Sequence, residues 1–152
     1  MRDNILINPN KLLRRKASPI KCNPMDMIRA TNMFNIMYKS NGMGLAAPQI
    51  GWNARLFVLD IESENTGRLI FVNPEIVEHS TELVDSIEGC LSVPNVQGLV
   101  KRYFAIKVLA SDIYGKKFVK DLTGLTSKCV QHEIDHFDGI LFIDKTEKVW
   151  NT

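Results

Sequence analysis

A chain of 152 residues with a formal net charge of +2 has too little positive charge for nucleic acid to be its main partner. Hydrophobic residues make up 45% and charged residues 24%, which is typical of a globular protein, and no apolar run approaches the roughly 20 residues that a membrane-spanning helix needs. The odd, low number of three cysteines argues against a disulfide framework and fits a reducing compartment. Residues 1–4 also do not resemble the start of a signal peptide. We therefore expect a cytoplasmic protein with one domain, 1–152, and no membrane partner.

The first predicted element is an amphipathic helix over residues 25–38. Its apolar side chains recur at helical spacing after Pro24. Residues 40–42, Ser-Asn-Gly, predict the end of this helix, because asparagine and glycine tolerate the left-handed backbone that stops a helix.

Strands are predicted for the middle of the chain. Residues 55–59 and 69–72 are short apolar runs, and an Asn-Pro pair is expected to end the second run. Over residues 99–108 the apolar side chains alternate at the period of a half-buried strand. A glycine-containing hairpin turn at 112–116 is predicted to lead into a further strand at 117–121.

A second helix is predicted over residues 125–137, with Thr123 as its N-cap and Gly139 as its stop signal. The order of a helix, several antiparallel strands and a helix differs from the repeated strand–helix–strand pattern of a parallel sheet. It predicts an α+β fold with an N-terminal amphipathic helix.

The predicted second helix carries the motif His-Glu-Ile-Asp-His. His132 and His136 are four residues apart, so both imidazoles lie on one helix face and can bind one metal ion. Glu133 follows the first ligand and can transfer a proton to or from a water molecule there without itself binding the metal. Two unrelated surface histidines are the alternative, but two of only three histidines fall at this spacing, and the third, His79, lies in a polar run that we expect at the surface. The expected architecture is therefore antiparallel β-sheets packed around a C-terminal metal-binding helix.

A catalytic metal site needs a third protein ligand and leaves one position for water. Cys90 is the favoured candidate, because a thiolate binds zinc or ferrous iron strongly and Gly89 before it allows close approach of the backbone. Cys22 and Cys129 are weaker candidates. A zinc peptidase would normally take a downstream histidine or glutamate as its third metal ligand, and no histidine follows this motif. A structural zinc site would fill all four metal positions with protein ligands and leave Glu133 without a role.

Three segments together resemble the peptide deformylase family. They are Gly-Met-Gly-Leu-Ala-Ala-Pro-Gln at 42–49, Glu-Gly-Cys-Leu-Ser at 88–92 and Gln-His-Glu-Ile-Asp-His at 131–136. Their order and separations match the family, and the resemblance extends over nearly the whole chain. A lone His-Glu-x-x-His motif is moderately specific, whereas the three segments in this order are highly specific. The resemblance implies removal of the formyl group from the N-terminal formyl-methionine of new polypeptides, with formylmethionyl peptides or nascent chains as partners.

The resemblance also implies roles for individual residues. One divalent metal ion would be present, with Fe²⁺ as the usual physiological metal and Zn²⁺, Ni²⁺ or Co²⁺ as substitutes. The ion would lower the pKa of a bound water molecule, and Glu133 would carry the water proton to the leaving amine. The side-chain amide of Gln49 and the backbone N–H of Leu91 would stabilise the oxyanion. The implied metal ligands are Cys90, His132 and His136.

Members of the family bind an extended peptide in the manner of an added strand, and one pocket must accept methionine. The residues expected to line this pocket are Met43, Gly44, Gly89, Leu91, Leu125, Cys129 and His132, with Lys128 at its rim. The residues expected to support the metal ligands, through a charge pair or by orienting a neighbour, are Glu88, Arg102 and Asp135.

Two features depart from many bacterial members. Gln97 stands where a basic residue often contacts the substrate. The segment after His136 is short, whereas many relatives extend into a longer C-terminal helix that helps them dock on the ribosome. We therefore expect any ribosome contact to be transient and weakened.

Overall fold

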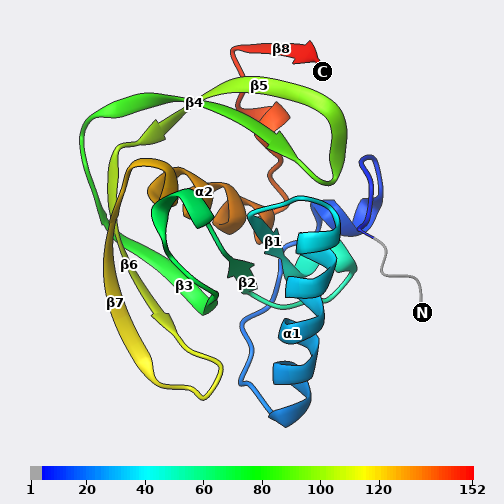
Figure 1. Ribbon diagram of the computed structural model, residues 1–152, viewed down its shortest axis with the longest axis vertical. Coiled ribbons are helices and arrows are strands. Elements are labelled where there is room, and N and C mark those ends of the chain that lie inside the picture. Colours follow the sequence, from blue (N-terminus) through cyan, green and yellow to red (C-terminus); the bar gives the residue numbers. More distant parts are fainter. Residues whose placement is uncertain (1–4) are drawn as a thin grey trace.

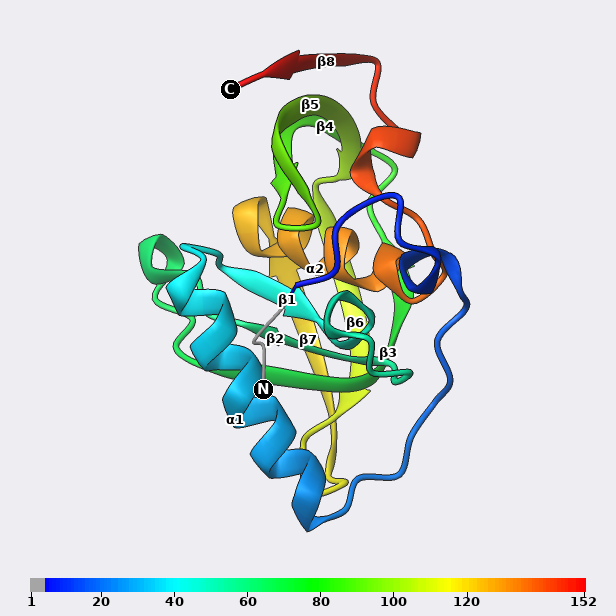
Figure 2. The same ribbon diagram turned by 90° about the vertical axis from the view of Figure 1, so that its right-hand side faces the viewer.

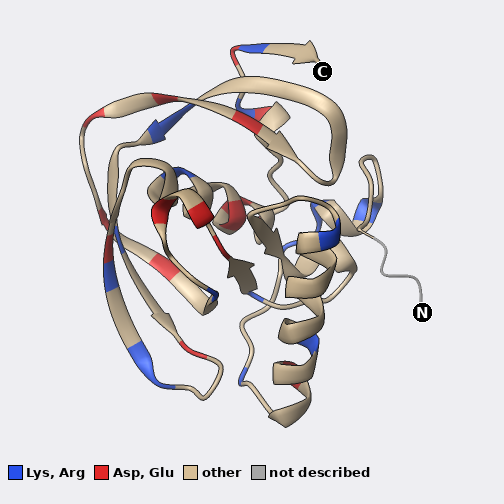
Figure 3. Ribbon diagram, viewed as in Figure 1, with Lys and Arg blue, Asp and Glu red and all other residues tan. Residues whose placement is uncertain are grey.

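The computed structural model describes residues 5–152, and the prediction for residues 1–4 lies outside this range. Among the described residues no helix is both long and apolar enough to cross a membrane. Positively and negatively charged residues are intermixed along the elements (Figure 3). The α-helices and β-strands follow the order α1 (Pro24–Lys39), β1 (Gly44–Ala46), β2 (Leu56–Leu59), β3 (Leu69–His79), β4 (Leu83–Cys90), β5 (Val93–Tyr103), β6 (Ala105–Ser111), β7 (Lys117–Thr123), α2 (Gly124–His136) and β8 (Lys148–Asn151).

The strands form two antiparallel sheets. The larger has the order β1-β2-β3-β6-β7, and the smaller has the order β4-β5-β8. Helix α2 lies between the β4–β5 hairpin and the larger sheet, and α1 runs along the outside of β1 and β2 (Figures 1 and 2). The α+β prediction, with antiparallel sheets around a C-terminal helix, is confirmed.

Helix α1 begins with a capping box. The Asn23 side chain accepts hydrogen bonds from the backbone N–H groups of Met25 and Asp26, and the Asp26 carboxylate accepts one from the Asn23 N–H. These contacts satisfy N–H groups that lack partners within the helix. At the other end Asn41 adopts a φ of 56°, so the predicted stop signal is confirmed and the helix is one residue longer at each end than predicted.

The prediction for β3 was wrong at its end. The strand continues through Asn73 and Pro74 to His79, with a register shift against β6 between Val72 and Glu75. Proline is tolerated there because a bulge removes the need for a ladder hydrogen bond. The Asn73 side chain holds the bulge by two hydrogen bonds to the backbone of Ile20, of 2.7 and 3.0 Å.

The single strand predicted over 99–108 was also wrong. The structure divides it at Phe104 into β5 and β6, which belong to different sheets. The apolar spacing of Phe104, Ile106 and Val108 includes the residue at the division, although Phe104 is 43% exposed, so the sequence pattern does not reveal the change of sheet. The prediction included no strand at β1, β4 or β8.

Helix α2 begins at Gly124, and Thr123 occupies the N-cap position without a side-chain hydrogen bond. The predicted cap position is therefore right, but the capping contact is absent. The helix ends at His136, one residue earlier than predicted, and Gly139 follows with a φ of 71°. A Cβ atom at Gly139 would lie 2.3 Å from the backbone oxygen of Arg14, so only glycine allows this chain crossing.

Candidate active site

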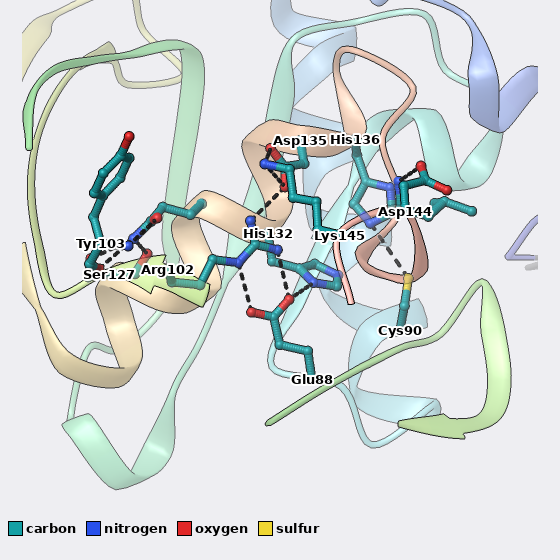
Figure 4. A network of polar contacts seen from close by, with 12 residues as sticks. Glu88, Cys90, Arg102, Tyr103, Ser127, His132, Asp135, His136, Asp144 and Lys145 are labelled. Atoms are coloured by element: carbon teal, nitrogen blue, oxygen red, sulfur yellow. Dashed lines mark hydrogen bonds and ion pairs between the residues drawn. The ribbon is translucent and has the colours of Figure 1, made fainter. Parts of the chain in front are cut away.

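Three side chains from two elements meet between α2 and the smaller sheet. His132 and His136 project from one face of α2, one turn apart, and Cys90 ends β4 (Figure 4). One ligand atom from each of the three lies within 4.8 Å of the others. The Cys90 Sγ and His136 Nε2 atoms are 3.6 Å apart. The structure therefore brings together the three predicted metal ligands.

The donor set fits a transition-metal ion. Two imidazoles and one thiol are the ligands that zinc and ferrous iron accept in proteins. His136 is 1% exposed, and burial lowers its pKa, which favours the neutral ring that a metal ligand needs. Its Nδ1 atom has no hydrogen-bond partner in the described structure. Cys22 lies elsewhere, against the cluster that α1 forms with the larger sheet.

A buried charge network orients His132. Its Nδ1 atom lies 2.9 Å from Glu88 Oε1, which leaves Nε2 free to face the other two ligands. Arg102 donates two hydrogen bonds of 2.8 Å to Glu88 and one of 2.6 Å to Asp135 (Figure 4). Burial alone would raise the pKa of Glu88, but the hydrogen bonds from Arg102 and His132 outweigh it and lower the pKa to about 2. The structure thus joins the three predicted supporting residues in one network.

Burial sets the properties of Glu133. Its side chain is 4% exposed, and burial raises the pKa of the carboxyl group to about 7. The Oε2 atom has no hydrogen-bond partner among the described residues. A Cβ atom at position 44 would lie 2.8 Å from Glu133 Oε1, so Gly44 leaves the space that the carboxylate occupies. The group is therefore poised to exchange a proton near neutral pH.

Gln49 is buried and held at both ends of its amide. Its Oε1 atom accepts a hydrogen bond of 2.9 Å from the Ala46 N–H, and its Nε2 atom donates one of 3.1 Å to Ser92 Oγ. Nε2 also lies 3.5 Å from Cys90 Sγ. Leu91 lies in the turn between β4 and β5, so its backbone follows the cysteine directly. Both predicted oxyanion partners are therefore beside the metal ligands.

A pocket of about 470 Å³ opens onto this centre. Leu125 and Cys129 line it from α2, and the Cys129 Sγ atom lies 3.6 Å from Met43 Sδ. Gly89 lines the pocket as predicted, and a Cβ atom there would meet its nearest neighbour, the Val96 carbonyl oxygen, at 3.6 Å. All the residues predicted to line the pocket do so: Met43, Gly44, Gly89, Leu91, Leu125, Cys129 and His132, with Lys128.

Several pocket residues were not predicted. Ser86, Ile87 and Val96 line it, and so does Thr152, whose backbone N–H donates to the Asn95 carbonyl. Because no strand was expected at β4, Ser86 and Ile87 could not be assigned to the pocket from the sequence. The even-numbered residues from Ser86 to Cys90 face inward, but the sequence shows no apolar alternation that would reveal this, because Ser86 and Glu88 are polar. His79 is exposed as predicted and stacks on Tyr103.

The comparisons with known proteins agree with this geometry. Residues 2–151 match the family model described as polypeptide deformylase. Peptide deformylase 1 of Clostridium perfringens is 42% identical over 93% of this chain and 95% of the relative, and the peptide deformylase of Natranaerobius thermophilus is 43% identical over 96% and 93%. The crystal structure of a Legionella pneumophila peptide deformylase aligns with a TM-score of 0.90 at 41% identity, over 95% of this chain and 85% of the other. That of a Synechococcus elongatus peptide deformylase in complex with actinonin aligns with a TM-score of 0.91 at 34% identity, over 95% and 80%.

Proposed function

This chain belongs to the peptide deformylase family, and from that premise we propose that the pocket beside Cys90, His132 and His136 is where it removes the formyl group. The chain is a metal-dependent hydrolase that releases the N-formyl group of nascent polypeptides as formate. One observation carries the assignment of the site. The three candidate ligand atoms lie within 4.8 Å of one another, and two of these residues, Cys90 and His132, line the pocket together with Glu133 and Gln49.

Cys90, His132 and His136 would hold one divalent metal ion, which supplies a Lewis acid that activates water and polarises the formyl group. We propose Fe²⁺ as the physiological ion and Zn²⁺, Ni²⁺ or Co²⁺ as substitutes. The mixed nitrogen and sulfur donor set supports this choice, because each of these ions accepts imidazole and thiolate.

Glu133 is the proposed proton carrier. Its carboxylate takes a proton from the attacking water and delivers it to the amine nitrogen as the C–N bond breaks. A pKa raised to about 7 suits both halves of this transfer, because the group can gain and lose a proton near neutral pH. Its unpartnered Oε2 atom is available for the water molecule.

Gln49 and Leu91 are the proposed oxyanion donors. The Ala46 N–H fixes the amide of Gln49 so that its NH₂ group faces Cys90. Sulfur is a weak hydrogen-bond acceptor, so the Nε2 group that lies 3.5 Å from Cys90 Sγ can donate to the formyl oxygen instead when substrate enters. The backbone N–H of Leu91 would donate from the other side.

Two free strand edges support an extended substrate. Among residues 5–152, β1 pairs only with β2 and β4 pairs only with β5, so each ends its sheet. Gly44 of β1 and Gly89 of β4 both line the pocket. A peptide placed between these edges can pair with the protein backbone and direct its methionine side chain toward Leu125 and Cys129.

The remaining parts of the proposal concern the chain as a whole. We propose one catalytic domain, 1–152, that acts in the cytoplasm on formylmethionyl peptides or nascent chains. Lys148–Asn151 form strand β8 against Val96–Leu99 of β5 instead of a helix. We propose that any ribosome contact is transient.

The test is a formate assay under anaerobic conditions with formyl-Met-Ala-Ser and unformylated Met-Ala-Ser. Formate released from the first peptide, with its peptide bonds intact, supports the proposal. Cleavage of a peptide bond in either substrate would instead identify a peptidase, the other class that uses a His-Glu-x-x-His helix. Glu133→Ala should retain the metal and lose most of its turnover.

A further inference from the structure

The contacts of the Gln49 side-chain amide fix its orientation. The Ala46 N–H can only donate, and it donates to one end of the amide at 2.9 Å, so that end is the oxygen atom Oε1. The NH₂ group therefore lies at the other end, with two hydrogens to donate. One acceptor beside it is Ser92 Oγ at 3.1 Å. Among the described residues, the only other acceptor beside it is Cys90 Sγ at 3.5 Å.

Ser92 is held firmly enough to serve as an anchor for this NH₂ group. The residue is 0% exposed, in the turn between β4 and β5, so bulk water does not compete for its hydroxyl oxygen. Its backbone carbonyl accepts a hydrogen bond of 2.8 Å from the Asn8 N–H, and the Gln49 carbonyl accepts one of 2.7 Å from the Leu6 N–H. One short stretch of chain therefore fixes both residues relative to each other.

Gln131 shows how a buried glutamine amide is satisfied where no substrate is expected. Its Nε2 atom donates to Ser127 Oγ at 3.0 Å and to the Tyr103 carbonyl at 2.9 Å, so both of its hydrogens have oxygen acceptors. Gln49 makes the same kind of serine contact, but its second hydrogen has only sulfur nearby, and sulfur is a weak acceptor. This second N–H of Gln49 is therefore the one that remains available to a substrate oxygen.

We propose that Ser92 is a positioning residue for the hydrolysis of the formyl group. Its hydroxyl oxygen binds one hydrogen of the Gln49 amide and thereby aims the other hydrogen at the formyl oxygen. The proposal rests on the proposed function, in which Gln49 stabilises the oxyanion. Without the hydroxyl the amide keeps its contact with Ala46, but a single contact leaves the amide plane free to turn. A donor that is not fixed in advance stabilises the developing charge less well.

The experiment measures kcat and KM for formyl-Met-Ala-Ser in the metal-loaded wild type, Ser92→Ala and Ser92→Cys. A thiol fills the place of the hydroxyl but is a weak acceptor, so Ser92→Cys separates loss of the hydrogen bond from loss of volume. We expect kcat to fall about tenfold in both variants while KM stays within about twofold of the wild type, because the lost interaction acts mainly in the transition state. Metal content should be unchanged.

A double-mutant cycle with Gln49→Ala tests whether Ser92 acts through Gln49. Gln49→Ala removes the donor itself and should lower kcat by roughly 100-fold. Adding Ser92→Ala to this variant should cause no further loss, because the amide that the hydroxyl positions is already absent.

Ser127→Ala is the matched control, because it also removes a buried serine acceptor from a glutamine amide, outside the pocket lining. Both serine variants should lose free energy of unfolding, measured with denaturant, since each leaves an amide hydrogen without its acceptor. Only Ser92→Ala should also lose kcat.

Four results would overturn the proposal. They are losses of kcat that multiply in the double variant, a wild-type kcat in Ser92→Cys, a wild-type kcat in Gln49→Ala, and an equal fall of kcat in Ser127→Ala, which would trace the effect to lost stability. Each of these leaves deformylation by the wild type intact. A wild type that releases no formate would instead mean that the proposed function itself has failed.

Discussion

The Nδ1 atom of His132 lies 2.9 Å from Oε1 of Glu88, a carboxylate that Arg102 holds in turn by two hydrogen bonds. This contact fixes which ring nitrogen faces the other metal ligands. Glu88 is two residues before Cys90 on the same face of β4, so one strand supplies both a ligand and the group that orients another ligand. The proposed metal centre is therefore built from β4 and α2 as a pair.

Removing the Glu88 charge should weaken metal binding. Glu88→Gln loses the carboxylate that orients His132, and we expect about a 10- to 100-fold loss in metal affinity. The affinity is measured by competition with a chelator. Asp85→Asn, an exposed position on the outer face of β4, is the control and should bind metal as the wild type does. Equal affinity in both variants would show that Glu88 does not orient the ligand.

Adding one methyl group at position 44 should affect turnover. In Gly44→Ala the new Cβ atom would lie 2.8 Å from Glu133 Oε1, so the carboxylate must move. We expect kcat for formate release to fall at least tenfold, because proton transfer depends on the position of this group. Metal content, measured in the same samples, should stay at the wild-type value. A wild-type kcat would argue against Glu133 as the proton carrier.

The three cysteines should differ in their importance. Cys90→Ala removes a proposed ligand and should abolish both metal binding and formate release. Cys22→Ser changes a half-buried residue outside the pocket and should leave both unchanged. Metal analysis and the formate assay on both variants provide the measurement. Full activity in Cys90→Ala would remove this residue from the site.

An ion pair outside the pocket lining should make stability depend on pH. The Arg14 guanidinium donates hydrogen bonds to Asp144 and lowers its pKa, so the folded protein prefers the charged carboxylate. The resulting stability is present above the unfolded pKa and is lost as pH falls through the folded pKa. Asp144→Asn should therefore reduce the free energy of unfolding at pH 7, by about 0.5–1 kcal/mol for this half-exposed pair.

The same comparison at pH 3 or below should show a smaller difference between Asp144→Asn and the wild type. Protonation of other groups affects both proteins equally, so the difference isolates Asp144. Denaturant unfolding at each pH provides the measurement. A difference that stays constant with pH would show that the carboxylate charge contributes nothing.

Local patterns were sufficient to predict the helical part of the candidate site. His132, Glu133 and His136 follow helical spacing, and a helix places them correctly without knowledge of the rest of the fold. The helix α1 was likewise predictable from its periodicity and its ends. In both cases the signal lies within one turn or a few turns of a single element.

Strand β4 could not be predicted, because its pattern is inverted. The outward-facing Leu83 and Ile87 are 52% and 67% exposed, while Ser86 and Glu88, which face inward, are 3% and 8% exposed. Polar residues are buried here because they line the pocket and hold His132. Functional sites are where the usual rule of apolar residues inside fails. The change of sheet at Phe104 was hidden for another reason, since it depends on contacts far apart in the sequence.

The most direct test of the account is metal reconstitution of the metal-free protein. Fe²⁺ would be added anaerobically in small steps, and formate release from formyl-Met-Ala-Ser would be measured at each step. The account predicts that activity rises in proportion to bound metal and reaches its plateau at one ion per chain. Formate release that is independent of bound metal, or absent at full metal occupancy, would contradict it.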